Sequence, residues 1–442
     1  MSGNNATQPT LEKAKASQVW SWASWDWGTS AFSVIITTFV FPIFIVQALF
    51  STDGETTGLE SAFAWAFTIS GVIVAVLAPI MGQRADRSQR TKTWLGVNTF
   101  IVGIATILMA FLTPAPPFFI YGLVLYLVAN VFYEFAFVNY NTVLVQISNP
   151  RNIGRISGFG WGLGYLGGIV ALLVVLVGFI GLGEGGGLFG VTADDQLNIR
   201  LAFAFTGLWV ALFTIPVLVG TPRSHAIEPG KPLSLGASYA KLFGDIAKLW
   251  RTERNTFNFL IASAIFRDGL AAVFTLGAVI AAAVFGFNTQ GIMMFGIAAN
   301  LVAGIGVFLG GFIEDRIGPK KLIVVSLIGL MVAGLYIFLF RDMGTITFWI
   351  GGLTLSFFVG PTQSSSRTFL GRLTTPGREG ELFGLYATTG RGLSWMTGLL
   401  FAIVVSATGN TAWGILAIVL VLLIGLLLLL PIPAPRRAAT DS

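Results

Sequence analysis

Four charged residues interrupt long apolar stretches of this sequence: Glu134, Arg267, Asp268 and Arg391. An isolated charge at the middle of a bilayer costs roughly 2.5–3.5 kcal/mol, so charges at such positions need partners or a water-filled cavity. Two acids and two bases balance one another, and we therefore expect them to pair or to line a cavity. The chemistry open to them is proton binding by Glu134 or Asp268 and carboxylate binding by an arginine. The alternative is structural, with Arg267 and Asp268 forming ion pairs between helices.

Asp26 is a fifth candidate for a substrate or proton pathway, at the predicted start of the first apolar stretch. This position favours a carboxylate that satisfies free N–H groups at a helix start. Four tryptophans surround it, Trp20, Trp22, Trp25 and Trp27. Such a group is typical of an aromatic belt at a membrane interface.

No residue pattern indicates an enzyme, a metal site or a cofactor site. Cysteine is absent, and the single histidine, His225, lies in a polar stretch. The sequence therefore lacks the His or Cys clusters that metals and nucleophilic catalysis require. Glycines spaced as in a nucleotide-binding loop occur from Gly162 to Gly167, but no strand precedes them, and no Walker motif exists. We predict no catalytic residues, no metal, no cofactor and no ATP-driven pumping by this chain.

The composition predicts an all-α polytopic membrane protein. Of the 442 residues, 55% are hydrophobic and only 10% are charged, a balance that no water-exposed globular surface tolerates. A membrane span needs about 20 apolar residues, and about twelve segments qualify. They are approximately residues 27–50, 61–82, 93–113, 118–147, 156–182, 200–220, 255–285, 289–312, 321–340, 345–366, 382–407 and 411–431.

The distribution of Lys and Arg predicts that both termini are cytoplasmic. This orientation leaves two of the 26 Lys and Arg residues outside, Arg200 and Arg341. It places three cations inside at the end of helix 10 and after it: Arg367, Arg372 and Arg378. The polar run in helix 10 fits two roles, hydrogen bonding at a cavity wall or contact between helices: Gln363, Ser364, Ser365, Ser366 and Arg367. Because the chain is compact, we expect a multi-pass protein of the cell inner (plasma) membrane rather than of an organelle.

Two sequence repeats predict that the chain consists of two similar halves. Residues 82–92 (GQRADRSQRTK) match residues 311–321 (GFIEDRIGPKK), and residues from 149 match residues from 375 through shared Pro and Gly positions. Because both copies follow equivalent helices on one side, the halves have the same topology, as in transporters that rock two bundles against each other. The expected units are six-helix bundles at residues 1–220 and 255–442.

The connector at residues 221–254 predicts an amphipathic helix. Its apolar residues follow helical spacing: Leu235, Tyr239, Leu242, Ile246 and Leu249. We expect this helix to lie along the cytoplasmic lipid surface; a disordered linker is the alternative.

The two copies of G-x-x-x-D-R after the second and eighth helices resemble the loop signature of the major facilitator superfamily. The positions that carry it are Gly82, Asp86, Arg87 and Arg90 in the first copy and Gly311, Asp315, Arg316, Gly318 and Lys320 in the second. The first copy departs from the family pattern at Gln89, where glycine is common. The resemblance implies that Asp86 contacts the start of helix 11 near Gly380 and that Asp315 contacts the start of helix 5 near Gly154, closing a cytoplasmic gate.

Longer segments resemble the vacuole effluxer branch of this superfamily, whose fungal members are linked to autophagy and amino-acid release. They are WDWGTSAFSVIITTFVFP in helix 1, GFGWGLGYLGG in helix 5, FRDG in helix 7 and PTQSSSRTFLGRLTTPGREGELFGLY across helices 10 and 11. The resemblance implies a secondary active transporter with rocker-switch alternating access that exports a small metabolite such as amino acids. Helices 1, 4, 7 and 10 would line its cavity and turn Glu134, Arg267 and Asp268 toward the substrate.

Several alternatives stay open at this point. The same residues fit proton coupling as symport or antiport, uncoupled facilitation, export of drugs or sugars, or a receptor that moves no solute. The expected partners are the lipid bilayer, a small-molecule substrate and protons, without nucleic acid, and we expect a monomer.

Overall fold

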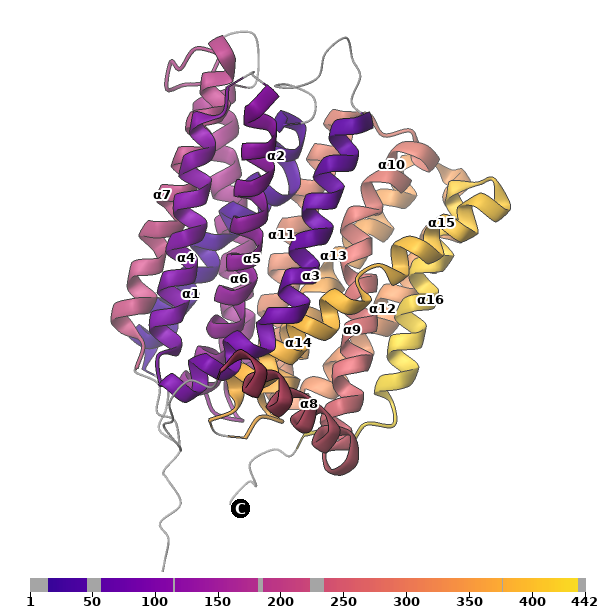
Figure 1. Cartoon of the computed structure of the whole chain (residues 1–442). Coiled ribbons are helices and arrows are strands. Elements are labelled where there is room, and N and C mark those ends of the chain that lie inside the picture. Colours follow the sequence, from indigo (N-terminus) through magenta and orange to yellow (C-terminus); the bar gives the residue numbers. More distant parts are fainter. Residues whose placement is uncertain are drawn as a thin grey trace, which may run out of the picture.

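The computed structural model describes residues 15–45, 57–113, 116–181, 186–222, 234–375 and 377–435. Its elements are helices that run side by side through the long axis of the molecule (Figure 1). Within the described ranges there is no strand, and eleven helices are long and apolar enough to cross a membrane. The all-α, polytopic prediction is confirmed.

The helices before the connector form what we name the first half. They are α1 (Ala16–Ala31), η1 (Phe32–Phe39), α2 (Val40–Ile43), α3 (Thr57–Ser88), α4 (Thr91–Leu108), η3 (Met109–Phe111), α5 (Pro116–Ile147), α6 (Ile153–Leu173), η4 (Val174–Ile180), η5 (Asp194–Gln196) and α7 (Leu197–Gly220). In this half α1 packs on α6 and α7, while α5 packs on α3 and α4. Small residues permit close packing, because a Cβ at Gly167 would overlap the backbone of Trp27.

The helices after the connector form the second half. They are α9 (Arg254–Thr275), α10 (Gly277–Phe285), α11 (Thr289–Ile317), α12 (Pro319–Leu339), η6 (Arg341–Met343), α13 (Thr345–Gly371), α14 (Glu379–Leu393), α15 (Met396–Thr408), η7 (Thr411–Trp413) and α16 (Gly414–Leu429). Here α13 packs on α11 and α12, and α16 packs on α9. Two predicted spans are therefore interrupted, one between α9 and α10 and the other between α14 and α15.

The first membrane helix begins earlier than predicted. Because α1 starts at Ala16, Asp26 lies about three turns inside a helix, and the prediction of a carboxylate at a helix start is wrong. The aromatic-belt prediction is also wrong for Trp22 and Trp25, which are fully buried, while Trp20 is 59% exposed. The two buried rings stack on Tyr140 of α5, which explains why they leave the membrane interface.

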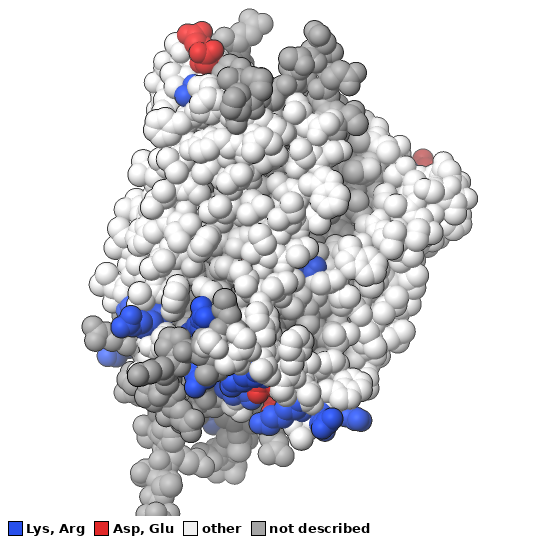
Figure 2. All heavy atoms as spheres, viewed as in Figure 1, with Lys and Arg blue, Asp and Glu red and all other residues white. Residues whose placement is uncertain are grey.

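Lys and Arg gather at one end of the molecule, and an almost uncharged band covers its middle (Figure 2). We name this the basic end and define it by the α3–α4 turn and the α11–α12 turn. A wide uncharged band is what lipid contact requires.

The two halves approach each other most closely at glycines near the basic end. A Cβ at Gly384 of α14 would lie 2.5 Å from Cα of Pro79 in α3, and a Cβ at Gly158 of α6 would lie 2.7 Å from the Val307 carbonyl oxygen in α11. Only hydrogen fits at these positions, so glycine sets the distance between the halves.

We expect Gly384→Val to destabilise the packing of α3 on α14 by about 1–3 kcal/mol, because the new side chain meets backbone that cannot move aside. Gly392→Val is the matched control in the same helix, since nothing lies within 4 Å of a Cβ there. Thermal unfolding in detergent measures the difference. Equal melting temperatures for the two variants would contradict the close packing.

The connector contains α8 (Leu235–Thr252), which the Ser234 hydroxyl caps by accepting a hydrogen bond from Ala237 N at 3.3 Å. Leu242 and Leu249 are 7% and 4% exposed on one face, whereas other faces leave large apolar side chains exposed. The connector thus contains a helix with one buried apolar face, and the alternative of a disordered linker is wrong for residues 235–252. Residues 223–233, with His225, lie outside the described residues.

Charged residues join α8 to the N-terminus of α14. Lys241 contacts Asp245 at 2.7 Å and Glu381 at 2.9 Å, and Arg378 contacts Asp245 at 3.2 Å and Glu381 at 2.7 Å. Burial lowers the pKa of Lys241, but hydrogen bonds to the two acids outweigh it and raise the pKa above its ordinary value. Burial raises the pKa of Asp245, but the hydrogen bond and attraction from Lys241 bring it below its ordinary value.

These shifts predict that α8 detaches from α14 in acid. An Asp with a lowered pKa stabilises the folded state above its ordinary pKa of about 3.9, and this stabilisation is lost as the pH falls through the folded-state pKa. We expect α8 amides to be protected from hydrogen exchange at neutral pH and to lose protection in acid. Asp245→Asn should remove most of this dependence, and Glu253→Gln should not; protection that ignores pH would contradict the assignment.

Candidate functional site

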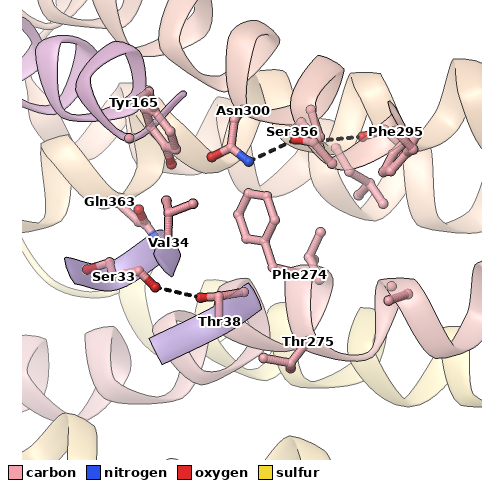
Figure 3. Close-up of a pocket in the computed structure, with 18 of the residues that line it drawn as sticks. Ser33, Val34, Thr38, Tyr165, Phe274, Thr275, Phe295, Asn300, Ser356 and Gln363 are labelled. Carbon is pink, nitrogen blue, oxygen red and sulfur yellow. Dashed lines mark hydrogen bonds between the residues drawn. The ribbon is translucent and has the colours of Figure 1, made fainter. Parts of the chain in front are cut away.

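A cavity of about 760 Å³ lies between the two halves. Its walls include η1 and α6 of the first half and α9, α11 and α13 of the second (Figure 3), with further residues from α1, α3, α5, α10, α12 and α16. Ser33 and Thr38 of η1 face it, with Asn300 and Gln363 among the polar groups of the second half. The rest of the lining is mainly apolar and aromatic, which suits a small amphipathic ligand.

The η1 segment is an eight-residue π-helix. Thr38 Oγ donates to the Ser33 carbonyl oxygen at 2.8 Å, five residues back along the chain. Ser30, Ser33, Thr37 and Thr38 all line the cavity. A π-helix is rare and frequently marks a functional site, and here it gives one wall of the cavity its row of hydroxyls.

Asp26 lies at the cavity wall and belongs to a buried polar cluster. Tyr140 Oη donates to Asp26 Oδ2 at 2.7 Å, and Arg367 Nη1 lies 3.8 Å from the same oxygen. Asp26 is 7% exposed and Arg367 only 2%. The cluster joins α1 and α5 of the first half to α13 of the second, so a charged contact crosses the interface between the halves.

Arg367 makes further contacts with the first half. Its Nε donates to Ser157 Oγ at 2.7 Å, its Nη2 donates to the Ser157 carbonyl oxygen at 2.7 Å, and its Nη1 reaches Asn141 Oδ1 at 3.5 Å. Its Cζ also lies 5.2 Å from the ring of Trp22 and 5.4 Å from that of Trp161. The guanidinium is therefore held by hydrogen bonds and aromatic faces, an arrangement that lysine could not reproduce.

The two loop-signature acids make the contacts that were expected of them. Asp86 accepts hydrogen bonds from Gly380 N at 3.0 Å and Glu381 N at 2.9 Å. Asp315 accepts from Gly154 N at 3.0 Å and Arg155 N at 3.3 Å. Each acid thus sits at the N-terminus of a helix from the other half, where free N–H groups and the helix dipole favour a negative charge.

The remaining signature residues lie in and around the two turns of the basic end. Gln89 has a φ of 53° and Gly318 a φ of 88°. Both turns thus use a left-handed residue, and at Gln89 a side chain occupies a conformation that glycine adopts without cost. Gly82 meets the backbone of Gly380 and Gly311 that of Gly154, so each turn lies beside the other half.

The signature cations have different surroundings. Arg87 is half-buried in the last turn of α3, whereas Arg90, before α4, and Arg316, in the last turn of α11, are exposed. Lys320 donates a hydrogen bond to the Leu430 carbonyl oxygen at 2.7 Å. Lys320 thereby ties the start of α12 to the residue that follows α16.

The four membrane charges do not form one cluster. Glu134 and Arg391 form an ion pair that joins α5 to α14. Arg267 instead donates to the Tyr386 carbonyl oxygen at 3.2 Å and covers the Tyr386 ring. Asp268 accepts from Thr397 N at 2.7 Å and from Thr397 Oγ at 2.6 Å.

Two expectations about these charges are therefore corrected. Arg267 and Asp268 form hydrogen bonds with uncharged groups of α14 and α15. The equal number of acids and bases had suggested charged partners. Among the five candidate pathway residues, Asp26 is the one that belongs to the described cavity lining. The helix positions of Arg267 and Asp268 turn them toward the neighbouring helices of their own half.

The sequence analysis did not single out two buried charges near the interface, Arg372 and Glu314. Arg372 directly follows α13, and its side chain is 4% exposed. Arg367 lies inside α13, in agreement with its predicted place in helix 10. Glu314 is fully buried and contacts Arg372 at 2.5 Å, Thr368 at 2.6 Å and Ser365 at 2.8 Å. The predicted span ended at Ser366, whereas α13 continues to Gly371.

Solved structures of other proteins share this fold. The proton:xylose symporter XylE matches 96% of this chain and 97% of its own with a TM-score of 0.74 at 11% identity. The transporter FucP, in an outward conformation, matches 96% of this chain and 98% of its own with a TM-score of 0.71 at 14% identity. The chain thus has the fold of the membrane transporters of the major facilitator superfamily.

Within that class, the chain belongs to the family described as vacuole effluxer Atg22 like, whose model matches residues 14–154 and 145–441. An uncharacterized MFS-type transporter of Bacillus subtilis, YxiO, is 26% identical over 95% of both chains. Autophagy-related protein 22 of Cryptococcus neoformans (strain B-3501A) is 25% identical over 65% of this chain. The match spans 53% of that fungal protein.

We expect Arg367→Gln to lower the free energy of unfolding by about 3–5 kcal/mol, because it leaves the buried Asp26 carboxylate without its cation. The double variant Asp26→Asn/Arg367→Gln should recover much of this loss, since no unpaired charge is then buried. Arg316→Gln, at an exposed position, is the matched control. Thermal unfolding in detergent checks all three; additive losses in the double variant would contradict a coupled pair.

Proposed function

We propose that this protein is a secondary transporter that works by rocker-switch alternating access and exports a small metabolite such as an amino acid with proton coupling. The observation that carries the proposal is the cavity between the halves, closed toward the basic end by contacts that cross from one half to the other. Its family and fold support a transporter in general. The substrate, the coupling and the mechanism are our inference.

The contacts between the halves form two successive layers. The outer layer contains the Asp86 and Asp315 carboxylates at helix N-termini of the opposite half. The inner layer contains Arg367 with Asp26 and Ser157, together with the Glu134–Arg391 pair. Opening the basic end would have to break the contacts of both layers. Water could then form hydrogen bonds with the polar groups that each half exposes. This is the bistable arrangement that alternating access needs.

Proton coupling has its best candidate in Asp26. Protonation would remove the charge that attracts Arg367 and would weaken one contact of the inner layer. Glu134 is the second candidate, because its pair with Arg391 also joins the halves. The Thr397 contacts of Asp268 join α9 to α15 within one half and favour a structural role.

The cavity wall suits an amino acid by its chemistry. The Asp26 carboxylate can attract the ammonium group of an amino acid, and the aromatic wall can contact an apolar side chain. Fungal relatives of this chain are named autophagy-related protein 22. Drugs and sugars would use the same wall without needing the carboxylate.

We further propose that the basic end faces the cytoplasm, so that both termini are cytoplasmic and the cavity faces outward. The concentration of Lys and Arg at this end supports the orientation (Figure 2). We place the protein in the cell inner membrane as a monomer.

Transport by purified protein in liposomes tests the proposal. We expect saturable efflux of loaded amino acids that an inward proton gradient stimulates. Asp26→Asn and Glu134→Gln should each abolish the stimulation, and the exposed Asp342→Asn should not.

Different failures separate the alternatives. Efflux that ignores the gradient would favour an uncoupled facilitator, and efflux of drugs or sugars alone would remove the amino-acid substrate. No movement of any solute by folded protein would overturn the transporter mechanism in favour of a receptor.

A further inference from the structure

A second cavity, of about 290 Å³, opens at the basic end among α1, α6 and α11. Its polar part contains Arg155 and Asn152, and its apolar part contains Trp20, Phe159 and Phe312. Trp20 and Phe312 are each 59% exposed, and the Arg155 side chain is 49% exposed. A groove that combines an exposed cation with exposed rings lies open on the membrane-facing surface.

The pseudo-symmetric groove in the molecule is already filled. The repeats relate α1, α6 and α11 to α9, α14 and α3, and α8 packs against α9 and α3 while its Lys241 binds Glu381 of α14. Tyr239 of α8 also donates to the Val76 carbonyl oxygen of α3 at 3.3 Å. The connector therefore occupies one of two equivalent grooves.

The charges of the two grooves are opposite. Glu381 follows Gly380 at the α14 N-terminus, and Arg155 follows the equivalent Gly154 at the α6 N-terminus. The filled groove presents an acid, which binds the lysine of its occupant. The open groove presents a cation, so its occupant must present an anion beside an apolar surface.

We propose that an anionic phospholipid occupies the open groove, with its phosphate on Arg155 and an acyl chain along Trp20, Phe159 and Phe312. Charge complementarity and the exposed rings favour a lipid over inorganic phosphate, which would make no use of the apolar wall. The exposed guanidinium stays within 3.6 Å of Asp315, so the lipid would bind next to one of the two signature contacts.

The site would also favour one conformation. Its wall contains α1 and α6 of the first half and α11 of the second, so the groove is complete only while the basic end is closed. A ligand that binds one state better shifts the population toward it. This part rests on the proposed alternating access, whereas lipid binding itself does not.

Native mass spectrometry of protein in detergent, titrated with phosphatidylglycerol or phosphatidylcholine, tests binding. We expect Arg155→Gln to weaken phosphatidylglycerol binding about fivefold, the effect of one cation near an anionic headgroup. Arg155→Lys should retain most of the binding, and Lys321→Gln, which removes an exposed cation from the same end, should change it little. Inorganic phosphate should not compete.

Equal phosphatidylglycerol binding by Arg155→Gln and the unchanged protein would overturn the site, as would occupation of the groove by residues 1–14. Competition by inorganic phosphate at equal concentration would also overturn it, because the apolar wall would then be unused.

A single cysteine tests the conformational part, since the chain contains no other. Thr37→Cys lies on the wall of the large cavity, and a membrane-impermeant maleimide should label it faster in nanodiscs with phosphatidylglycerol than in phosphatidylcholine alone. Adding Arg155→Gln should remove the difference. Phosphatidylglycerol binding without this difference in labelling would overturn the conformational part but not the lipid site. If the unchanged protein transports solute but does not bind phosphatidylglycerol, the lipid site is overturned and the proposed transporter is not.

Discussion

The guanidinium of Arg367 is the constraint on which the arrangement of the two halves depends. While the basic end is closed, a charge buried this deeply needs partners in fixed positions, because water does not reach it. Its partners come from α1, α5 and α6 of the first half, while its own helix belongs to the second. The halves must therefore meet in one register for the charge to be satisfied. The glycine contacts of α3 with α14 and of α6 with α11 make that close meeting sterically possible.

The two loop signatures extend the same principle to the basic end. Each places a carboxylate at the N-terminus of a helix from the other half, so each half caps the other. The free N–H groups of α6 and α14 are thus satisfied by a distant part of the chain and not by their own caps. The connector α8 adds a third tie, since its Lys241 binds a residue whose backbone already contacts Asp86.

Local patterns in the sequence were enough to predict the helices, the repeat and the amphipathic connector, whereas the partners of Asp86 and Asp315 followed from the resemblance to the superfamily. They succeed because apolar length, helical spacing and a repeated motif are properties of short segments. The partners of Arg267 and Asp268 could not be predicted, because these depend on how far each helix is rotated about its axis. Glu314 and Arg372 were missed for a related reason, because only the packing of α11 on α13 brings these two residues together. The prediction for the tryptophans near Asp26 was wrong for Trp22 and Trp25, because a buried aromatic cluster and an interfacial belt have the same composition.

The π-helix η1 has a consequence for how the cavity wall can change. Its hydrogen bonds join residues five apart, so it is wider than an α-helix and its side chains follow a different angular spacing. If this stretch tightened to an α-helix, Ser33 and Thr38 would turn about the helix axis relative to Asp26, which lies in the regular helix before them. The hydroxyl side of the cavity wall therefore depends on the π-helical hydrogen bonding of this segment.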